Sequence, residues 1–206
     1  MKTPNGRANM NDRQVNNSIS EQLRASSDVK LALLESHIGV IGQIADSICQ
    51  ALKAGGKVML FGNGGSAADA QHIASELVGR YKIERPAMSA LALTTDTSLL
   101  TALSNDYDFN QVFVRQVQSM TRPCDVIVGI TTSGKSANVL NALREGSRLG
   151  AKTVCFSGMD GGPCAEAADI SLIVPSSDVP RIQEAHITVG HIVCHLVEEE
   201  MFAAGG

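Results

Sequence analysis

Aromatic side chains are scarce in this sequence: they make up 3% of its 206 residues, and tryptophan is absent. A core without many large rings has to be filled by alanine, valine, leucine and isoleucine. Hydrophobic residues still make up 44% of the chain and charged residues 18%, a balance that excludes a disordered protein. A core of small and branched apolar residues is common in parallel sheets covered by helices.

The sequence also lacks a disulfide pattern, a long apolar run and an excess of basic charge. Its five cysteines are dispersed, with no C-x-x-C spacing, which favours reduced thiols and predicts a cytoplasmic protein. No apolar run approaches the roughly 20 residues of a membrane span, and the first residues contain no apolar core of a secretory signal. The net charge of −4 argues against binding nucleic acid through bulk electrostatics. We therefore expect neither a membrane nor a nucleic-acid partner.

Short apolar runs alternate with helical patterns along most of the chain. Strands are predicted at 57–62, 89–95, 125–131, 151–158 and 169–175, and helices at 66–78, 111–120, 137–149 and 181–201. Apolar strands that are each followed by a helix predict right-handed βαβ units and a parallel sheet. Residues 19–54 read as helical, with an N-cap at Ser26 or Ser27. The polar, Asn-rich residues 1–18 are predicted to be a disordered tail, and residues 19–206 a single domain.

The stretch GNGGSAADAQHIASEL (62–77) places three glycines between a predicted strand and a helix. Its G-x-G-x-x-A pattern matches a dinucleotide-binding turn, which requires an acidic residue about 20 positions further on. The first acidic residue after the second strand is Asp96, 34 residues after Gly62, so the nucleotide interpretation fails. Two interpretations remain open: a tight turn built for close packing, or a loop whose amides approach an oxyanion or a sugar hydroxyl.

A second loop, GITTSGKS (129–136), matches the phosphate-binding P-loop pattern letter by letter. Gly129 lies inside the apolar run VIVGI, however, which assigns it to a strand, and no later apolar strand ends directly in a magnesium-binding aspartate. The segment still carries four hydroxyls in six residues, at Thr131, Thr132, Ser133 and Ser136. Together with the amides at the start of the next helix they suit a phosphate monoester. Ordinary N-capping is the alternative and accounts for one or two of them.

A third polar stretch, SNDYDF (104–109), contains Asn105 and Asp106. These side chains are suited to binding hydroxyls, but residues of this kind are also common in turns.

Two predicted helices carry residues that can bind a metal or transfer protons. His72 and Glu76 are four positions apart and share a helix face, a spacing that taken alone is more often a solvated polar stripe than a site. The last helix is apolar around most of its circumference, so Gln183 and His191 need partners in the interior. These two lie about 80° apart around the axis and roughly 12 Å apart along it. They can face one cavity if another helix or a ligand lies opposite. A core histidine satisfied by a neighbour remains the alternative for His191.

The motifs GNGGSAADAQH, TTSGKSANV and RIQEAHITVGH, in this order, resemble the sugar isomerase (SIS) domain of the phosphoheptose isomerase family. The resemblance covers about residues 38–202. It implies a three-layer α/β/α sandwich with a central parallel sheet and N-terminal helices packed alongside, a homotetramer, and one Zn²⁺ per subunit. The sequence departs from the family at Lys135, where relatives often have asparagine, and at Thr131, where serine is common.

The resemblance also implies a reaction and its residues. Members of the family are aldose–ketose isomerases that convert sedoheptulose 7-phosphate into D-glycero-D-manno-heptose 7-phosphate through an enediol, the first step of activated-heptose biosynthesis for lipopolysaccharide core or related glycans. The positions matching the catalytic acid–base pair are Glu76 and His191. Those matching the metal ligands are His72, Glu76, Gln183 and His191. Those matching the substrate contacts are Asn63, Gly64, Gly65, Glu76, Asn105, Asp106, Thr131, Thr132, Ser133, Ser136 and Gln183.

A second class of relatives offers an alternative function. Some SIS proteins have lost catalysis and serve as tetramers that bind the DnaA replication initiator. They keep the glycine loop and the RIQE motif but lack the glutamate that matches Glu76 and the histidine that matches His191. Both residues are present here, which favours the enzyme.

Overall fold

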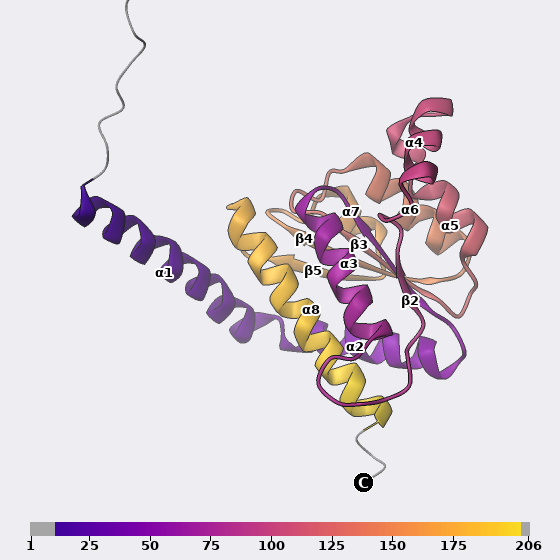
Figure 1. The fold of residues 1–206 in the computed structure, drawn as a ribbon, viewed down its shortest axis with the longest axis horizontal. Coiled ribbons are helices and arrows are strands. Elements are labelled where there is room, and N and C mark those ends of the chain that lie inside the picture. The colour runs from indigo at the N-terminus through magenta and orange to yellow at the C-terminus, as the bar shows by residue number, and fades with distance from the viewer. Residues whose placement is uncertain (1–10, 203–206) are drawn as a thin grey trace, which may run out of the picture.

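A computed structural model describes residues 11–202 and contains one parallel five-stranded sheet (Figure 1). The strand order is β2-β1-β3-β4-β5, and all four neighbouring pairs are parallel, which confirms the predicted sheet. The strands are β1 (Val58–Gly62), β2 (Ala90–Ala92), β3 (Val126–Ile130), β4 (Lys152–Gly158) and β5 (Ile170–Val174). The helices are α1 (Asp12–Ser36), α2 (Ile38–Lys53), α3 (Gly65–Val78), α4 (Thr97–Asp106), the 3₁₀ turn η1 (Phe109–Gln111), α5 (Val114–Met120), α6 (Ala137–Arg148), α7 (Gly162–Ala167) and α8 (Val179–Phe202).

Two apolar clusters cover the two faces of this sheet. Alternate residues of each strand point to opposite faces: Leu60 packs in a cluster with residues of α2, α3 and α8, while Phe61 packs with residues of α5 and α6. Every residue of β1 and β3 is buried, as expected for strands covered on both sides. The protein is therefore the three-layer α/β/α sandwich that was expected.

The strand order fixes where a ligand site can form. The chain moves from β1 outward to β2 and then returns to β3 on the other side of β1, which makes β1 and β3 the switch point of the sheet. Ligands of open parallel sheets bind beyond the carboxyl ends of the strands at this point. Gly62 and Ile130, the last residues of β1 and β3, are paired in register. The glycine loop and the hydroxyl-rich loop therefore begin side by side.

The N-terminal helical region differs from its prediction. The single helix expected over 19–54 is two helices, because the backbone at His37 leaves helical geometry and its N–H closes α1 on Leu33. The N-cap is Asn11, not Ser26 or Ser27: Asn11 and Gln14 bond to each other's backbone in a capping box. Residues 12–18, expected in the disordered tail, form the first turns of α1, and the rest of that prediction falls on residues 1–10, outside the described part of the chain.

Two short helices were not predicted. Asp96 accepts a hydrogen bond from the Leu99 N–H and so begins α4, whose last two residues are Asn105 and Asp106. The other is α7, which follows β4 after a glycine turn. Within residues 11–202, no helix combines the length and the apolar character needed to cross a lipid bilayer.

Candidate active site

Three of the four predicted metal ligands meet between α3 and α8. His72 Nε2 lies 3.2 Å from Glu76 Oε1 and 3.1 Å from His191 Nε2, and one ligand atom from each of the three residues lies within 4.8 Å of the others. His72 and Glu76 come from successive turns of α3, while His191 reaches them from α8. The helix face that carries His72 and Glu76 is therefore directed at another helix, and it is not only a solvated polar stripe.

Gly190 allows this approach of the two helices. A Cβ at this position would lie 2.6 Å from Ile73 Cδ1, so a larger residue would have to displace the Ile73 side chain or α8 itself. His72 is next to Ile73 and His191 is next to Gly190, so this close packing brings the two histidines to 3.1 Å from each other. The cluster is open on one side, since the His72 side chain is 46% exposed and that of Glu76 22%.

Gln183, the fourth predicted ligand, lies apart from this cluster. Its side-chain amide packs against Gly65 at the start of α3, so closely that a Cβ on residue 65 would collide with it. His72 is seven residues further along α3, and His191 eight residues further along α8, about 12 Å along the axis. The structure therefore groups Gln183 with the glycine loop.

The glycine loop is braced from the neighbouring strand–helix unit. The side-chain amides of Asn63 and Asn138 exchange two hydrogen bonds, each of 2.9 Å. Asn138 belongs to the first turn of α6, so this pair ties the loop after β1 to the loop after β3. Gly64 has a φ of 58°, a region that favours glycine, and no side chain caps the start of α3. The glycines allow close packing, as the first open interpretation predicts. The approach of the loop amides to a ligand stays a prediction, and the N–H groups of Ser66 and Ala67 already bond to the carbonyls of Asn63 and Gly64.

The hydroxyl-rich loop has a defined shape at the start of α6. The hydroxyls of Thr131 and Ser136 lie 3.1 Å apart, and Ser133 Oγ accepts a hydrogen bond from the Lys135 N–H. Gly134 has a φ of 67° and packs so tightly on Gly161 that a Cβ would clash with the backbone there. Ser136 occupies the N-cap position but makes no capping hydrogen bond. N-capping therefore does not account for Ser136. Of the first-turn amides, that of Val139 donates to Asn138 Oδ1, while those of Ala137 and Asn138 make no hydrogen bond within residues 11–202 and are available to an anion.

The P-loop interpretation fails in the structure as well as in the sequence. Gly129 lies within β3, as the apolar run predicted. The Lys135 ammonium lies 3.5 Å from the Asp160 carboxylate, and both side chains are more than half exposed.

Asn105 and Asp106 lie at the exposed end of α4. The Asn105 amide donates a hydrogen bond of 2.9 Å to the Asp106 carboxylate. Within residues 11–202 no hydrogen bond joins either residue to His72, Glu76 or His191. The third predicted segment thus stays separate from the cluster in a single chain.

Asp69 is a further carboxyl group near the cluster, one turn before His72 on α3. Burial raises the pKa of Asp69 to about 6, and the nearby charge of His72 acts in the opposite direction. A carboxyl group with such a pKa changes its protonation state close to neutral pH. The sequence shows that Asp69 lies three residues before His72, but not that it is partly buried.

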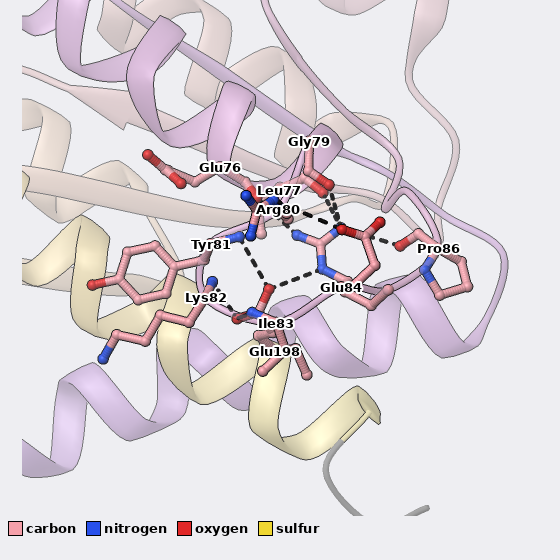
Figure 2. A network of polar contacts seen from close by, with 11 residues as sticks. Glu76, Leu77, Gly79, Arg80, Tyr81, Lys82, Ile83, Glu84, Pro86 and Glu198 are labelled. Carbon is pink, nitrogen blue, oxygen red and sulfur yellow. Dashed lines mark hydrogen bonds and ion pairs between the residues drawn. The ribbon is translucent and has the colours of Figure 1, made fainter.

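Sequence reasoning missed a network of polar contacts that encloses the end of α3 (Figure 2). Its centre is an ion pair between Arg85 Nε and Glu198 Oε1 at 3.1 Å, with side chains 1% and 2% exposed. Tyr81 belongs to the same segment, and its ring lies 5.7 Å from that of His191, centroid to centroid. The only sequence signal was a glutamate seven positions after His191, hidden in the charged run EEE.

The architecture and its switch-point loops match a known class of protein. The family model of the SIS domain covers residues 23–158 of the chain, so fold and loops together define a SIS-domain protein.

Individual relatives give a finer assignment. A phosphoheptose isomerase of Aquifex aeolicus is 55% identical over 181 residues, which are 88% of this chain and 95% of that protein. A phosphoheptose isomerase of Sulfurimonas denitrificans is 49% identical over 190 residues, 91% of this chain and 97% of that one. The solved structure of the phosphoheptose isomerase from Neisseria gonorrhoeae has a TM-score of 0.85 at 38% identity, with 90% of this chain and 99% of that one covered. The chain belongs to the phosphoheptose isomerase family.

Proposed function

We propose that the protein is an aldose–ketose isomerase that converts sedoheptulose 7-phosphate into D-glycero-D-manno-heptose 7-phosphate. The observation that carries the proposal is the meeting of Glu76 and His191 around His72 at the α3–α8 contact. Relatives that share half of the residues over nearly the whole chain carry the name of this enzyme. Family and geometry therefore support the same reaction.

The proposed chemistry is proton transfer between C1 and C2 of the sugar through an enediol. One group removes a carbon-bound proton, a second protonates the neighbouring carbon, and the developing oxyanion needs stabilisation. Glu76 and His191 supply a carboxylate and an imidazole on opposite walls of the cluster, one from α3 and one from α8. A substrate lying between the two helices can exchange protons with both.

We further propose that the cluster holds Zn²⁺. Zinc bonds of about 2.0–2.1 Å to nitrogen and oxygen place tetrahedral ligands about 3.3 Å apart, close to the 3.1 and 3.2 Å that separate His72 from His191 and Glu76. The donor set of two imidazoles and a carboxylate is also typical of zinc. The ion would act as a Lewis acid towards the carbonyl and hydroxyl oxygens of the sugar. Because a metal-bound side chain is a weaker base, Glu76 and His191 alternate between ligation and proton transfer in this proposal.

The phosphate group is proposed to bind at the hydroxyl-rich loop. Thr131, Ser133 and Ser136 directly precede α6, where the N–H groups of its first two residues and the helix dipole favour an anion. The reacting carbons are then placed at a distance from the phosphate, so binding energy at the loop orients the sugar. Asn63, Gly64, Gly65 and Gln183 would contact the hydroxyls between the two ends.

Assembly and location complete the proposal. We propose a cytoplasmic homotetramer, supported by five cysteines that are all free and by an apolar groove between α1, α2 and α8. In such an assembly Gln183 or the Asn105–Asp106 segment of a second copy could join the cluster, which they do not reach within one chain. No nucleic-acid or membrane partner is part of the proposal.

The DnaA-binding alternative is disfavoured by the retained Glu76 and His191 and by the names of the relatives.

The decisive experiment is an isomerase assay on sedoheptulose 7-phosphate, with and without a chelator, together with metal analysis. We expect kcat to fall by at least about 100-fold in Glu76→Gln and in His191→Ala, since general acid–base groups contribute about this much. His195→Gln is the control, because His195 lies one turn further along α8 and pairs with Glu199 at the surface. Full turnover by either cluster variant would refute the acid–base assignment. Phosphate release from ATP that depends on Lys135 would instead favour the P-loop.

A further inference from the structure

The end of α3 contacts a buried arginine, Arg85, which lies in the segment between α3 and β2. Arg85 Nη2 donates a hydrogen bond of 2.8 Å to the carbonyl of Glu76, and Nη1 donates one of 2.8 Å to the carbonyl of Leu77 and one of 3.2 Å to that of Gly79 (Figure 2). The last carbonyls of a helix have no partner within it, and here one guanidinium bonds to two of them, those of Glu76 and Leu77. The backbone of Glu76 is therefore fixed by Arg85 directly.

Glu198 holds the other half of the same network from α8. Its carboxylate accepts hydrogen bonds from the N–H groups of Tyr81, Lys82 and Ile83, at 3.0, 2.8 and 3.2 Å, in addition to the one from Arg85 (Figure 2). Burial raises the pKa of Glu198, but these hydrogen bonds outweigh it and hold the pKa below its usual value. The lowered pKa favours the carboxylate form, which is the form that pairs with Arg85.

The segment that Glu198 anchors carries an aromatic ring to His191. Tyr81 begins this segment, and its ring lies at a centroid distance of 5.7 Å from His191 with an interplanar angle of 32°. Glu198 lies two turns beyond His191 on α8, while Arg85 reaches the backbone of Glu76 on α3. The Arg85–Glu198 ion pair thus bonds to the backbone of Glu76 and to the backbone of Tyr81, whose ring lies beside His191.

We propose that the Arg85–Glu198 pair positions Glu76 and His191 for the reaction, beyond any part it has in stability. This inference rests on the proposed isomerase function. A buried ion pair is weak grounds for a stabilising role, since its desolvation cost offsets much of its attraction. A displacement of about 1 Å, in contrast, is enough to lower a rate by about 100-fold. Neither Arg85 nor Glu198 touches the cluster atoms, so both act through Glu76 and Tyr81.

The test is the kinetic effect of Glu198→Gln, measured on folded protein. The amide has one acceptor oxygen where the carboxylate has two, so part of the backbone segment is released. We expect kcat to fall by about tenfold or more while KM for sedoheptulose 7-phosphate stays within about twofold, because the phosphate loop is untouched. Arg85→Lys is the second variant. Its single ammonium cannot bond Glu198 and the helix carbonyls at the same time, so we expect kcat to fall, but by less than in Glu198→Gln because the positive charge is kept.

A matched control is the buried carboxylate that directly precedes β3. Asp125 is a buried carboxylate that accepts hydrogen bonds from the N–H groups of Lys57 and Arg122 and pairs with the Lys57 ammonium. Asp125→Asn removes a similar interaction whose partners, Lys57 and Arg122, belong neither to the cluster nor to the Arg85–Glu198 network, so we expect a loss of thermal stability with an unchanged kcat. If Asp125→Asn and Glu198→Gln lower kcat equally at the same folded fraction, or if Glu198→Gln leaves kcat intact, the positioning role is refuted.

A readout that does not depend on activity separates this inference from the proposed function. In protein with ¹³C-labelled histidine and tyrosine, nuclear Overhauser effects should connect the rings of Tyr81 and His191. We expect them to weaken or disappear in Glu198→Gln and to persist in Asp125→Asn. An inactive wild type would refute the isomerase, whereas ring contacts that persist in Glu198→Gln would refute the positioning role whatever the activity.

Discussion

At the scale of single residues, His186 shows how burial sets the chemistry of a side chain that the site does not use. It is fully buried on α8, and one ring nitrogen lies 3.0 Å from the carbonyl oxygen of Ser157. Burial lowers the pKa of His186 to about 4, although the hydrogen bond to Ser157 acts in the opposite direction. His186 is therefore a neutral core histidine.

His186 should make the protein sensitive to acid. Between pH 6.5 and about 4 the unfolded chain binds a proton at this residue and the folded protein does not, so stability falls as the pH falls through this window. A shift of this size corresponds to about 3 kcal/mol when integrated over the window. We expect His186→Gln to flatten the dependence of the free energy of unfolding on pH, measured by urea denaturation at a series of pH values. An unchanged slope in the variant would contradict the assignment.

At the scale of elements, the start of α6 combines a helix terminus with a shaped loop. Ser136 leaves the helix uncapped and directs its hydroxyl to Thr131, and the loop is held in place by the contact of Gly134 with Gly161. Exposed helix amides with adjacent hydroxyls bind phosphate without needing a lysine. The proposed phosphate site therefore depends on the element and its loop, and Lys135 is free to pair with Asp160.

Removing a hydroxyl from this loop should weaken substrate binding without removing the chemistry. In Ser136→Ala we expect KM for sedoheptulose 7-phosphate to rise by about tenfold, the size of one hydrogen bond to a charged group, with kcat within about twofold. Competitive inhibition by inorganic phosphate should weaken in parallel. Ser147→Ala, on the exposed far end of the same helix, is the control. A fall in kcat with unchanged KM would place the phosphate elsewhere.

The sequence predicted the elements that burial marks strongly and missed those that depend on tertiary contacts. Buried parallel strands read as unbroken apolar runs, so β1, β3, β4 and β5 were found within one or two residues of their bounds. The break at His37 has no proline, and the nearest glycine, Gly39, lies two residues later inside α2, so the apolar pattern runs on through it. The break lets α2 pack on the sheet while α1 extends away from it.

The sequence likewise predicted some residues of the candidate site and missed others. His72 and Glu76 follow from helix periodicity, and the family resemblance supplied His191 as their partner. The place of Gln183 beside Gly65 could not be predicted, since spacing along a helix does not say what lies opposite. Glu198 was hidden because three successive glutamates end the last helix, and only the fold selects the one that turns inward to Arg85.

At the scale of the whole molecule, α1 is the element that the single chain leaves incompletely covered. Its N-terminal part extends away from the sandwich (Figure 1) and exposes an apolar stripe that includes Ile19 and Leu23, 53% and 66% exposed. Arg181, buried on α8, fixes the direction of α1 through hydrogen bonds to the backbone and side chain of Gln22. Near the other end of α1, a groove of about 570 Å³ is lined by Leu34, Ile38 and residues of α2 and α8. Exposed apolar surface of this extent marks an interface, and the proposed homotetramer provides its partner.

This surface predicts the effect of a charge on assembly and on activity. In sedimentation analysis we expect the wild type to have a mass of four times 21.7 kDa. We expect the variants Leu23→Asp and Leu34→Asp to dissociate, because a buried unpaired carboxylate is strongly unfavourable in an apolar interface. Glu21→Lys, exposed on the same helix, should leave the mass unchanged. Activity should fall with the tetramer, since Gln183 and the cluster around His191 lie apart in one chain. A wild type that sediments as a monomer would refute the tetramer. Fully active monomers of Leu34→Asp would show instead that one chain completes the site alone.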